Sequence, residues 1–363
     1  TTSMDFMYFF PHGRHSLMEA EFEAVKEMGL RFHGFRGCMP VMEGNLPAEM
    51  KEHLGIDAGE LVESYEDIMD ACEKTFQKYH DNSPFSMSRV GLGPTTVVFE
   101  NPEFMRELKA MADRYQGLLH THLHPRPDEI KKCGELYGKR PHQWLEEIGW
   151  MDKNVSFAHI SRHNAEELDI VARNGASVTQ SPSCHMRLGY PVAPALEARD
   201  RGIPVSIGVD GGASNDSGDM LGELRAMLYV HRIEGGHPGY GPERWINAKE
   251  VFEMATVNGA KCLNREDIGM LKEGMAADIV LFSMMQPGYA GALTDPRGAL
   301  LYCGNNHLAD TTIVNGKVLI ENGIFLAGDL NQIIEDANNA TARILKLVKE
   351  KTGIDYRMEA QKP

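Results

Sequence analysis

The feature that most constrains the fold is an alternation of short strand patterns with helical patterns over the first part of the chain. Strand patterns cover residues 1–10, 30–37, 85–94, 117–124, 155–161, 175–182 and 203–212. Between them, residues 16–29, 101–116 and 164–175 place apolar side chains at helical spacing, and two of these three segments end in glycine. Alternation of this kind predicts a parallel sheet with crossover helices.

Two arrangements of a parallel sheet are compatible with this alternation. A doubly wound sheet that binds a dinucleotide should have a glycine-rich phosphate turn after its first strand, and none follows the first strand pattern. The polar residues instead follow the ends of several strands, where the active sites of (β/α)8 barrels are built. Because such a barrel needs eight strands, we expect an α/β fold of the TIM-barrel type, with its first strand upstream of Thr1 and strands 2 to 8 in this chain.

The pattern changes at about Gly269. Residues 268–283 and 310–325 are typical of short strands, with tight turns at Asn315–Gly316 and Asn322–Gly323. An amphipathic helix is expected over residues 330–350. We therefore expect a barrel over residues 1–268, the C-terminal part of a small β-sandwich over 269–328, and a helix with a tail over 329–363.

The composition of the chain limits which classes of partner and which location we expect for it. The chain has 37 basic and 52 acidic residues and a net charge of −15, so it repels phosphate backbones and we expect no nucleic-acid partner. No run of about 18 apolar residues occurs, so no membrane span is expected. The six cysteines form no C-x-x-C pair, and we interpret them as free thiols of a cytoplasmic protein.

Three polar residues at strand ends could bind a metal. His122 lies near the end of the fourth strand pattern, His159 lies on the fifth, and Asp210 lies on the seventh. Two imidazoles and a carboxylate suit a catalytic divalent metal with an open position for water. Each residue alone could equally be a hydrogen-bonded polar residue of the core, but their shared position at one end of the sheet favours the metal site.

Neighbouring residues have less specific roles. Strand alternation puts His120 and His124 on the same face as His122. We expect His120 to be a packed, hydrogen-bonded neighbour and His124 to contact substrate or solvent. Arg36, Arg89 and His185 are candidates to orient a substrate, although a rim arginine is as often part of a surface salt bridge.

The same motifs carry a family resemblance. The segments HTHL, AHIS, SPSCHMRLG and GVDGGASND closely resemble the amidohydrolase superfamily, especially its 8-oxoguanine deaminase, guanine deaminase and triazine hydrolase branch. The resemblance implies a (β/α)8 barrel beside a β-sandwich, and one bound divalent metal, zinc first and iron second. It also implies a homodimer or a higher homo-oligomer. His122, His159 and Asp210 match three positions of the family's metal set, whereas the H-x-H of the family's first strand has no match.

The chain departs from the family pattern at two further positions. Relatives usually have a glutamate three residues after the position of His122, where it protonates the ring nitrogen of the substrate, and this chain has Pro125 there. His124, Asp128 and Glu129 are nearby candidates to replace it. The second departure is His185, where relatives often have asparagine.

The resemblance implies a metal-dependent hydrolase that removes an amino or similar group from a nitrogen heterocycle such as a purine, pterin or triazine. In this hypothesis a metal activates water, Asp210 accepts its proton and passes it to the leaving group, and His159 polarises the attacked centre. Two alternatives stay open. One is a related protein that binds a heterocycle or a partner without turnover, and the other is a chlorohydrolase or ring-amide hydrolase on the same fold.

Overall fold

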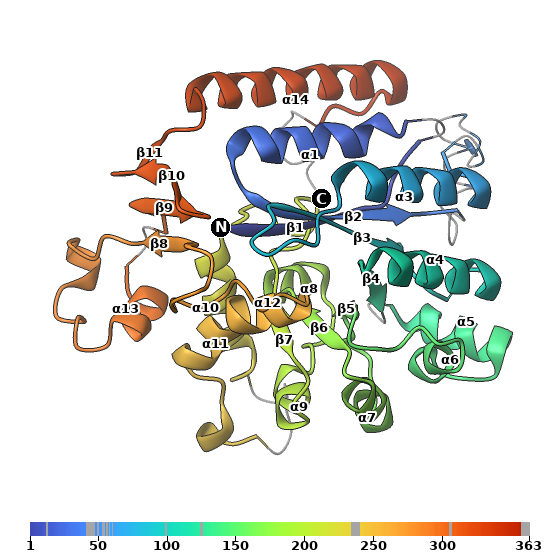
Figure 1. Cartoon of the computed structure of the whole chain (residues 1–363), viewed down its shortest axis with the longest axis horizontal. Helices are drawn as coiled ribbons and strands as arrows, with labels where there is room; N and C mark the ends of the chain where they lie inside the picture. The colour runs from blue at the N-terminus through green and yellow to red at the C-terminus, as the bar shows by residue number, and fades with distance from the viewer. Residues whose placement is uncertain are drawn as a thin grey trace.

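A seven-stranded parallel sheet, with the strand order β1-β2-β3-β4-β5-β6-β7, forms the centre of the molecule (Figure 1). The computed structural model describes residues 1–11, 14–40, 48, 51–52, 55, 57, 59, 61–98, 100–123, 126–233, 240–304 and 307–356. The strands are β1 (Thr2–Met7), β2 (Arg31–Cys38), β3 (Ser88–Pro94), β4 (Leu118–Leu123), β5 (Val155–His159), β6 (Ser177–Gln180) and β7 (Val205–Ile207). Each of the seven strand patterns thus forms a strand, with ends that differ by a few residues.

Helices follow the strands and cover the sheet. They are α1 (Ser16–Met28), α3 (Tyr65–Tyr79), α4 (Pro102–Tyr115), α5 (Pro127–Tyr137), α6 (Pro141–Glu147), α7 (Ala165–Asn174), α8 (Pro182–Leu188), α9 (Ala195–Asp200), α10 (Met220–Val230), α11 (Ala248–Ala255) and α12 (Val257–Cys262). Short 3-10 helices lie at Pro242–Arg244 and Pro287–Tyr289. This order of elements is the strand–helix alternation that the sequence predicts.

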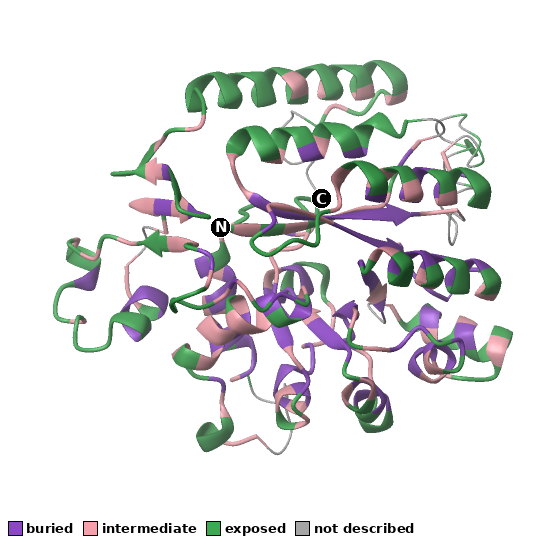
Figure 2. Ribbon diagram, in the orientation of Figure 1, coloured by how far each residue is buried: buried purple, intermediate pink, exposed green. Residues whose placement is uncertain are grey.

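Helix α4 illustrates how the sequence sets the core. Asn101 caps its N-terminus by accepting a hydrogen bond from the backbone N–H of Glu103, and Pro102 stands in the first turn, where no backbone donor is needed. One face of the helix is buried against the sheet, and its residues are Phe104, Met105, Leu108, Met111 and Ala112. Figure 2 shows the same division in the large sheet, where the strands from β2 to β7 are mostly buried and the helices around them are exposed on the outer side.

The sheet curls around its inner face. β1 and β4 are not neighbours in the sheet, yet the ring of Phe6 on β1 lies 5.2 Å from that of His120 and 5.4 Å from that of His122, both on β4. Phe35 on β2 also contacts His120, at 5.6 Å between ring centroids. Side chains from separate strands therefore fill a common interior, as in TIM-type barrels.

A smaller antiparallel sheet follows, with the order β11-β10-β9-β8. Its strands are β8 (Ile279–Leu281), β9 (Thr311–Val314), β10 (Lys317–Glu321) and β11 (Ile324–Phe325), and α13 (Pro296–Tyr302) lies between β8 and β9 in the chain. Asn315 and Gly316 both have positive φ, which a two-residue hairpin turn requires. The hairpin turns expected at both Asn-Gly pairs are therefore confirmed, whereas the domain boundaries stay a prediction.

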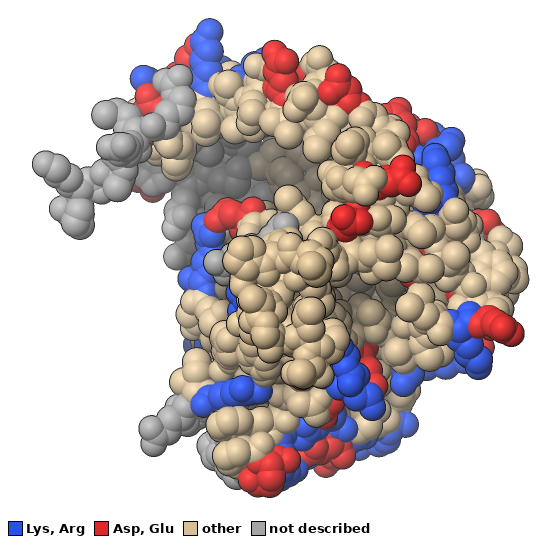
Figure 3. All heavy atoms as spheres, turned by 90° about the vertical axis from the view of Figure 1, so that its left-hand side faces the viewer, with Lys and Arg blue, Asp and Glu red and all other residues tan. Residues whose placement is uncertain are grey.

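The C-terminal helix and the surface complete the molecule. Helix α14 (Leu330–Thr352) occupies the expected segment and lies beyond α1 in the view of Figure 1. Figure 3 shows acidic and basic side chains interspersed around a central area without charged residues.

All six cysteines are free, as their spacing predicts. Within the described part of the chain, no helix is long and apolar enough to cross a membrane.

A buried ion pair connects the small sheet to the amino end of the large one. The Arg31 guanidinium donates to both carboxylate oxygens of Asp278, at 3.1 and 3.0 Å, and to the carbonyl oxygens of Phe85 and Ser86. Asp278 also accepts from the backbone N–H of Asn315 in the β9–β10 turn, at 2.8 Å. The Arg31 side chain is fully buried and that of Asp278 is 6% exposed, so each charge depends on the other for compensation.

We expect Asp278→Asn to destabilise the protein strongly. The change leaves the buried Arg31 guanidinium without a counter-charge, which costs about 3–5 kcal/mol of unfolding free energy. Urea denaturation followed by circular dichroism measures it. Glu19→Gln is the matched control, because the Glu19–Lys78 pair is about half exposed on both sides and should contribute little. Equal losses in the two variants would contradict this role for Arg31 and Asp278.

His33 should make the protein sensitive to mild acid. Burial and then the positive charge of Arg265 lower the pKa of His33 well below its usual value. Since the unfolded chain binds the proton more readily, stability should fall as the pH drops below about 6.5, by at most about 1.4 kcal/mol per pH unit for this group. His33→Gln should flatten that slope in urea titrations between pH 7.5 and 5.5. Parallel slopes for the wild type and the variant would show that His33 does not contribute.

Candidate functional site

The carboxyl edge of the large sheet brings the three predicted metal ligands together. His122 lies one residue before the end of β4, His159 is the last residue of β5, and Asp210 follows β7. The rings of His122 and His159 are stacked, with centroids 5.4 Å apart and planes 9° apart. Both rings also lie close enough to the Asp210 carboxyl group to interact with it electrostatically. Parallel strands thus deliver residues far apart in the sequence to one place.

An unusual backbone conformation determines where the side chains of His159 and Asp210 point. In the register of β4 and β5, His122 pairs with Ala158 and His159 pairs with Leu123, so a regular pleat would turn His159 away from His122. His159 instead has a φ of 74° and Ile160 a φ of 41°. Asp210 also has a positive φ, of 65°. Residues with side chains avoid this left-handed region, and such strain clusters at functional sites.

A backbone carbonyl fixes the orientation of His122. The Nδ1 atom of His122 lies 2.7 Å from the carbonyl oxygen of Thr95, and because a carbonyl can only accept, Nδ1 carries the proton. In the neutral ring, Nε2 is then the nitrogen with the lone pair, as a metal ligand needs. Phe6 and Tyr8 pack against the ring, each 5.4 Å away between centroids.

Cys184 joins the site, and the sequence analysis missed it. Ligand atoms of His159, Cys184 and Asp210 all lie within 4.8 Å of one another. Cys184 is 1% exposed, and burial together with its hydrogen bond to Asp210 raises the pKa of its thiol to about 12. A search for C-x-x-C pairs cannot find a cysteine whose partners come from other strands. Its position directly before His185, just after a strand, was the available signal.

The protonation states suit a metal. Burial, and then the charges of His122 and His185, lower the pKa of His159 to about 3, so this ring is neutral near pH 7. Burial opposes ionisation of Asp210, but hydrogen bonds from the Cys184 thiol and the Gly211 N–H lower the pKa of its carboxyl group below the usual value. A neutral imidazole and a carboxylate are the forms that bind a metal. Nitrogen, sulfur and oxygen ligands in one cluster fit zinc.

His120 has the supporting place that the sequence predicts. It is 4% exposed, and its Nδ1 lies 2.7 Å from the hydroxyl oxygen of Ser156 on β5. Burial lowers the pKa of His120 to about 3, so it stays neutral beside His122. The packed, hydrogen-bonded neighbour expected there is confirmed.

The two arginines do not reach this site. Arg36 contacts Glu63 at 2.5 Å, and its guanidinium lies 3.7 Å from the centroid of the Phe10 ring, whereas Phe35 before it points to His120. Alternation along β2 therefore directs Arg36 to the other face of the sheet. Arg89 is the second residue of β3, so it lies at the amino end of the sheet and not at the carboxyl edge, where a residue that orients the substrate is expected. Their roles in substrate binding stay predictions that this geometry does not favour.

The remaining candidates lie close to His159 or outside the described residues. His185 on α8 is 2% exposed, and its Nε2 lies 3.0 Å from Nδ1 of His159. His124 and Pro125 belong to the part of the chain that the structure does not describe. Glu129 is fully buried, with its carboxylate 3.6 Å from the Arg126 guanidinium.

Comparisons with known proteins identify relatives of this chain. The chain is 32% identical to 8-oxoguanine deaminase of Pseudomonas aeruginosa, over 95% of this chain and 73% of the relative. It is 30% identical to isoxanthopterin deaminase of an unknown prokaryote, over 90% of this chain and 68% of that protein. The crystal structure of a zinc complex of atrazine chlorohydrolase from Arthrobacter aurescens TC1 matches with a TM-score of 0.85 and 34% identity, over 93% of this chain and 72% of that one.

These relatives are hydrolases of nitrogen heterocycles, and the solved structure confirms the TIM-type barrel expected from the strand count. The family model described as "Amidohydrolase family" matches residues 1–319, which include every strand of the large sheet and every candidate ligand. The chain therefore belongs to the amidohydrolase family.

Proposed function

We propose that this protein is a metal-dependent hydrolase that removes an amino group from a nitrogen heterocycle of the purine, pterin or triazine class. The observation that carries the proposal is the cluster of His159, Cys184 and Asp210, with His122 stacked beside it, at the carboxyl edge of a family barrel. Relatives named as deaminases of 8-oxoguanine and isoxanthopterin support the class of reaction.

His122, His159 and Asp210 would hold one divalent metal, with Cys184 as a further ligand. Zinc is the first choice, because imidazole, thiolate and carboxylate are its usual ligands, and iron is the second. A bound metal of this kind lowers the pKa of water toward about 7 and so supplies a nucleophile at neutral pH. The solved relative that contains zinc supports this choice.

Side chains of the protein would then accept and donate the protons that the reaction transfers. In the metal-free protein the Cys184 thiol and the Gly211 N–H donate to Asp210 and favour its ionised form, whereas in the loaded site the Gly211 N–H is the donor that remains. The Asp210 carboxylate is then available to accept a proton from water and pass it to the leaving amine. His159 stays neutral, and its ring nitrogen with the lone pair would bind the metal. His124, Asp128 and Glu129 remain the candidates to protonate the ring nitrogen of the substrate.

A second candidate function is removal of a chloro group from a triazine. The similarity to atrazine chlorohydrolase, at a TM-score of 0.85, favours it specifically. A panel of amino- and chloro-substituted purines, pterins and triazines separates the two functions, since ammonia is released in one case and chloride in the other. Binding of a heterocycle without release of either product would indicate a protein that only binds.

The expectation of a homodimer or a higher oligomer, and of the cytoplasm as the location, stays a prediction.

Asp210→Asn should abolish most of the activity. An amide cannot accept the proton of water, so we expect kcat/KM for ammonia release to fall by about 10²–10⁴-fold. Asp216→Asn is the matched control, because Asp216 lies in the same loop, exposed and paired with Arg187. The metal content of each variant, measured by elemental analysis, separates lost binding from lost proton transfer. Unchanged turnover in Asp210→Asn would exclude this mechanism.

Cobalt should report whether Cys184 is a ligand. A coordinating thiol loses its proton, and a thiolate bound to cobalt absorbs strongly in the near ultraviolet. We expect this absorption in the cobalt-loaded protein and its loss in Cys184→Ser. Cys262→Ser is the control, since Cys262 is also buried but contacts the carbonyl oxygens of Val178 and Pro204 instead. A cobalt-loaded wild type without the band would remove Cys184 from the ligand set.

A further inference from the structure

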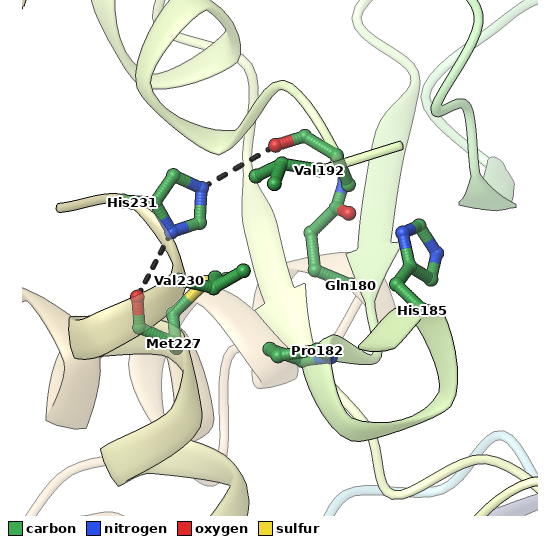
Figure 4. Close-up of a pocket in the computed structure, with 8 residues that line it drawn as sticks. Gln180, Pro182, His185, Val192, Met227, Val230 and His231 are labelled. Atoms are coloured by element: carbon green, nitrogen blue, oxygen red, sulfur yellow. Dashed lines mark hydrogen bonds between the residues drawn. The ribbon is translucent and has the colours of Figure 1, made fainter. Parts of the chain in front are cut away.

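His185 is enclosed in the protein and so has little access to a substrate. It is 2% exposed and lies beside a cavity of about 10 Å³, which is room for about one water molecule. Figure 4 shows the ring at one side of this cavity, with Gln180, Val192 and His231 around the rest. A heterocycle does not fit there. The contacts of His185 with the protein therefore define its role better than the substrate contact that its place in the sequence predicts.

The hydrogen bonds of His185 fix where its proton sits. Its Nδ1 lies 2.9 Å from the carbonyl oxygen of Pro191, and a carbonyl accepts only, so Nδ1 is the donor. In the neutral ring Nε2 must then be an acceptor. The atom that faces Nε2, at 3.0 Å, is Nδ1 of His159. His159 therefore donates from Nδ1 to His185.

This direction of donation decides which nitrogen His159 offers. With the proton held on Nδ1, the lone pair of the neutral His159 ring is on Nε2. His122 reaches the same state through the carbonyl of Thr95. Both histidines thus present Nε2 as the basic nitrogen, one supported by the backbone and the other by a side chain. Only the support of His159 can be removed by changing one side chain.

We propose that His185 is a positioning residue that sets the tautomer and the orientation of His159 for metal binding. The proposal rests on the metal site of the proposed function. Outer hydrogen-bond partners of metal-bound histidines fix the ring and raise its basicity, and their loss typically weakens metal affinity by about 10–100-fold. His185 acts through His159 and touches neither the substrate nor the reacting atoms.

A pair of substitutions separates the two bonds of His185. In His185→Gln the side-chain amide ends near the place of the ring Nε2, so its oxygen can still accept from His159. In His185→Asn the amide ends near the place of Nδ1, so it can still donate to Pro191 but does not reach His159. His231→Gln is the control, because His231 lines the same cavity and bonds to the carbonyl oxygen of Met227 at 2.9 Å instead.

The first readout is the tautomer of His159 in the metal-free protein, from long-range ¹⁵N–¹H spectra of histidine-labelled samples. We expect the proton on Nδ1 in the wild type, in His185→Gln and in His231→Gln, and a shift toward the Nε2-protonated form in His185→Asn. A wild type with the proton on Nε2 of His159 overturns the proposal. Thermal unfolding of each metal-free variant checks that the comparison is made between folded proteins.

The second readout is zinc affinity, from competition with a chromogenic chelator. We expect His185→Asn to bind zinc about 10–100-fold more weakly than the wild type, and His185→Gln and His231→Gln to bind it nearly as tightly. Equal affinity in His185→Asn and the wild type overturns the proposal. A wild type that binds no zinc instead contradicts the proposed function, and the tautomer spectra still decide the role of His185.

Discussion

The parallel ladder from β1 to β7 is the constraint on which the candidate site depends. It aligns the carboxyl ends of β4, β5 and β7, so His122, His159 and Asp210 meet although long stretches of sequence separate them. Curling of the sheet then closes the interior, as the contact of Phe6 with both His120 and His122 shows. Without this alignment the same residues would be scattered polar groups, and no cluster of ligands would form.

The site departs from regular structure where its chemistry requires it. His159, Ile160 and Asp210 adopt positive φ, and strain of this kind costs of order 1–3 kcal/mol for each residue. Burial also keeps His120 and His159 neutral at a cost in hydration. A rigid parallel sheet with a packed core can hold such a centre in place. As a result of this strain and burial, the neutral imidazoles and the carboxylate are already oriented before any ligand binds.

Opposite ends of the sheet have different tasks. At the amino end, the ion pair of Arg31 with Asp278 joins the small sheet to the large one, and Arg265 pairs with Asp267 nearby in the chain. The carboxyl end instead carries histidines, a thiol and Asp210. Barrels commonly separate stability from function in this way. The separation explains why Arg89, at the second residue of β3, takes part in the amino-end cluster and does not lie near the candidate metal site.

The order of strands and helices, the hairpin turns and the candidacy of three residues can be predicted from the sequence, because they follow from local periodicity and residue type. These residues are His122, His159 and Asp210. Tertiary structure alone decided which side chains meet. Cys184 enters the cluster from the first turn of α8, and Arg36 points to the opposite face toward Glu63. His159 turns toward His122 only because its backbone leaves the regular pleat. Such contacts depend on strand register, sheet curvature and backbone strain. These involve segments that are distant in the sequence, so the local sequence pattern does not reveal them.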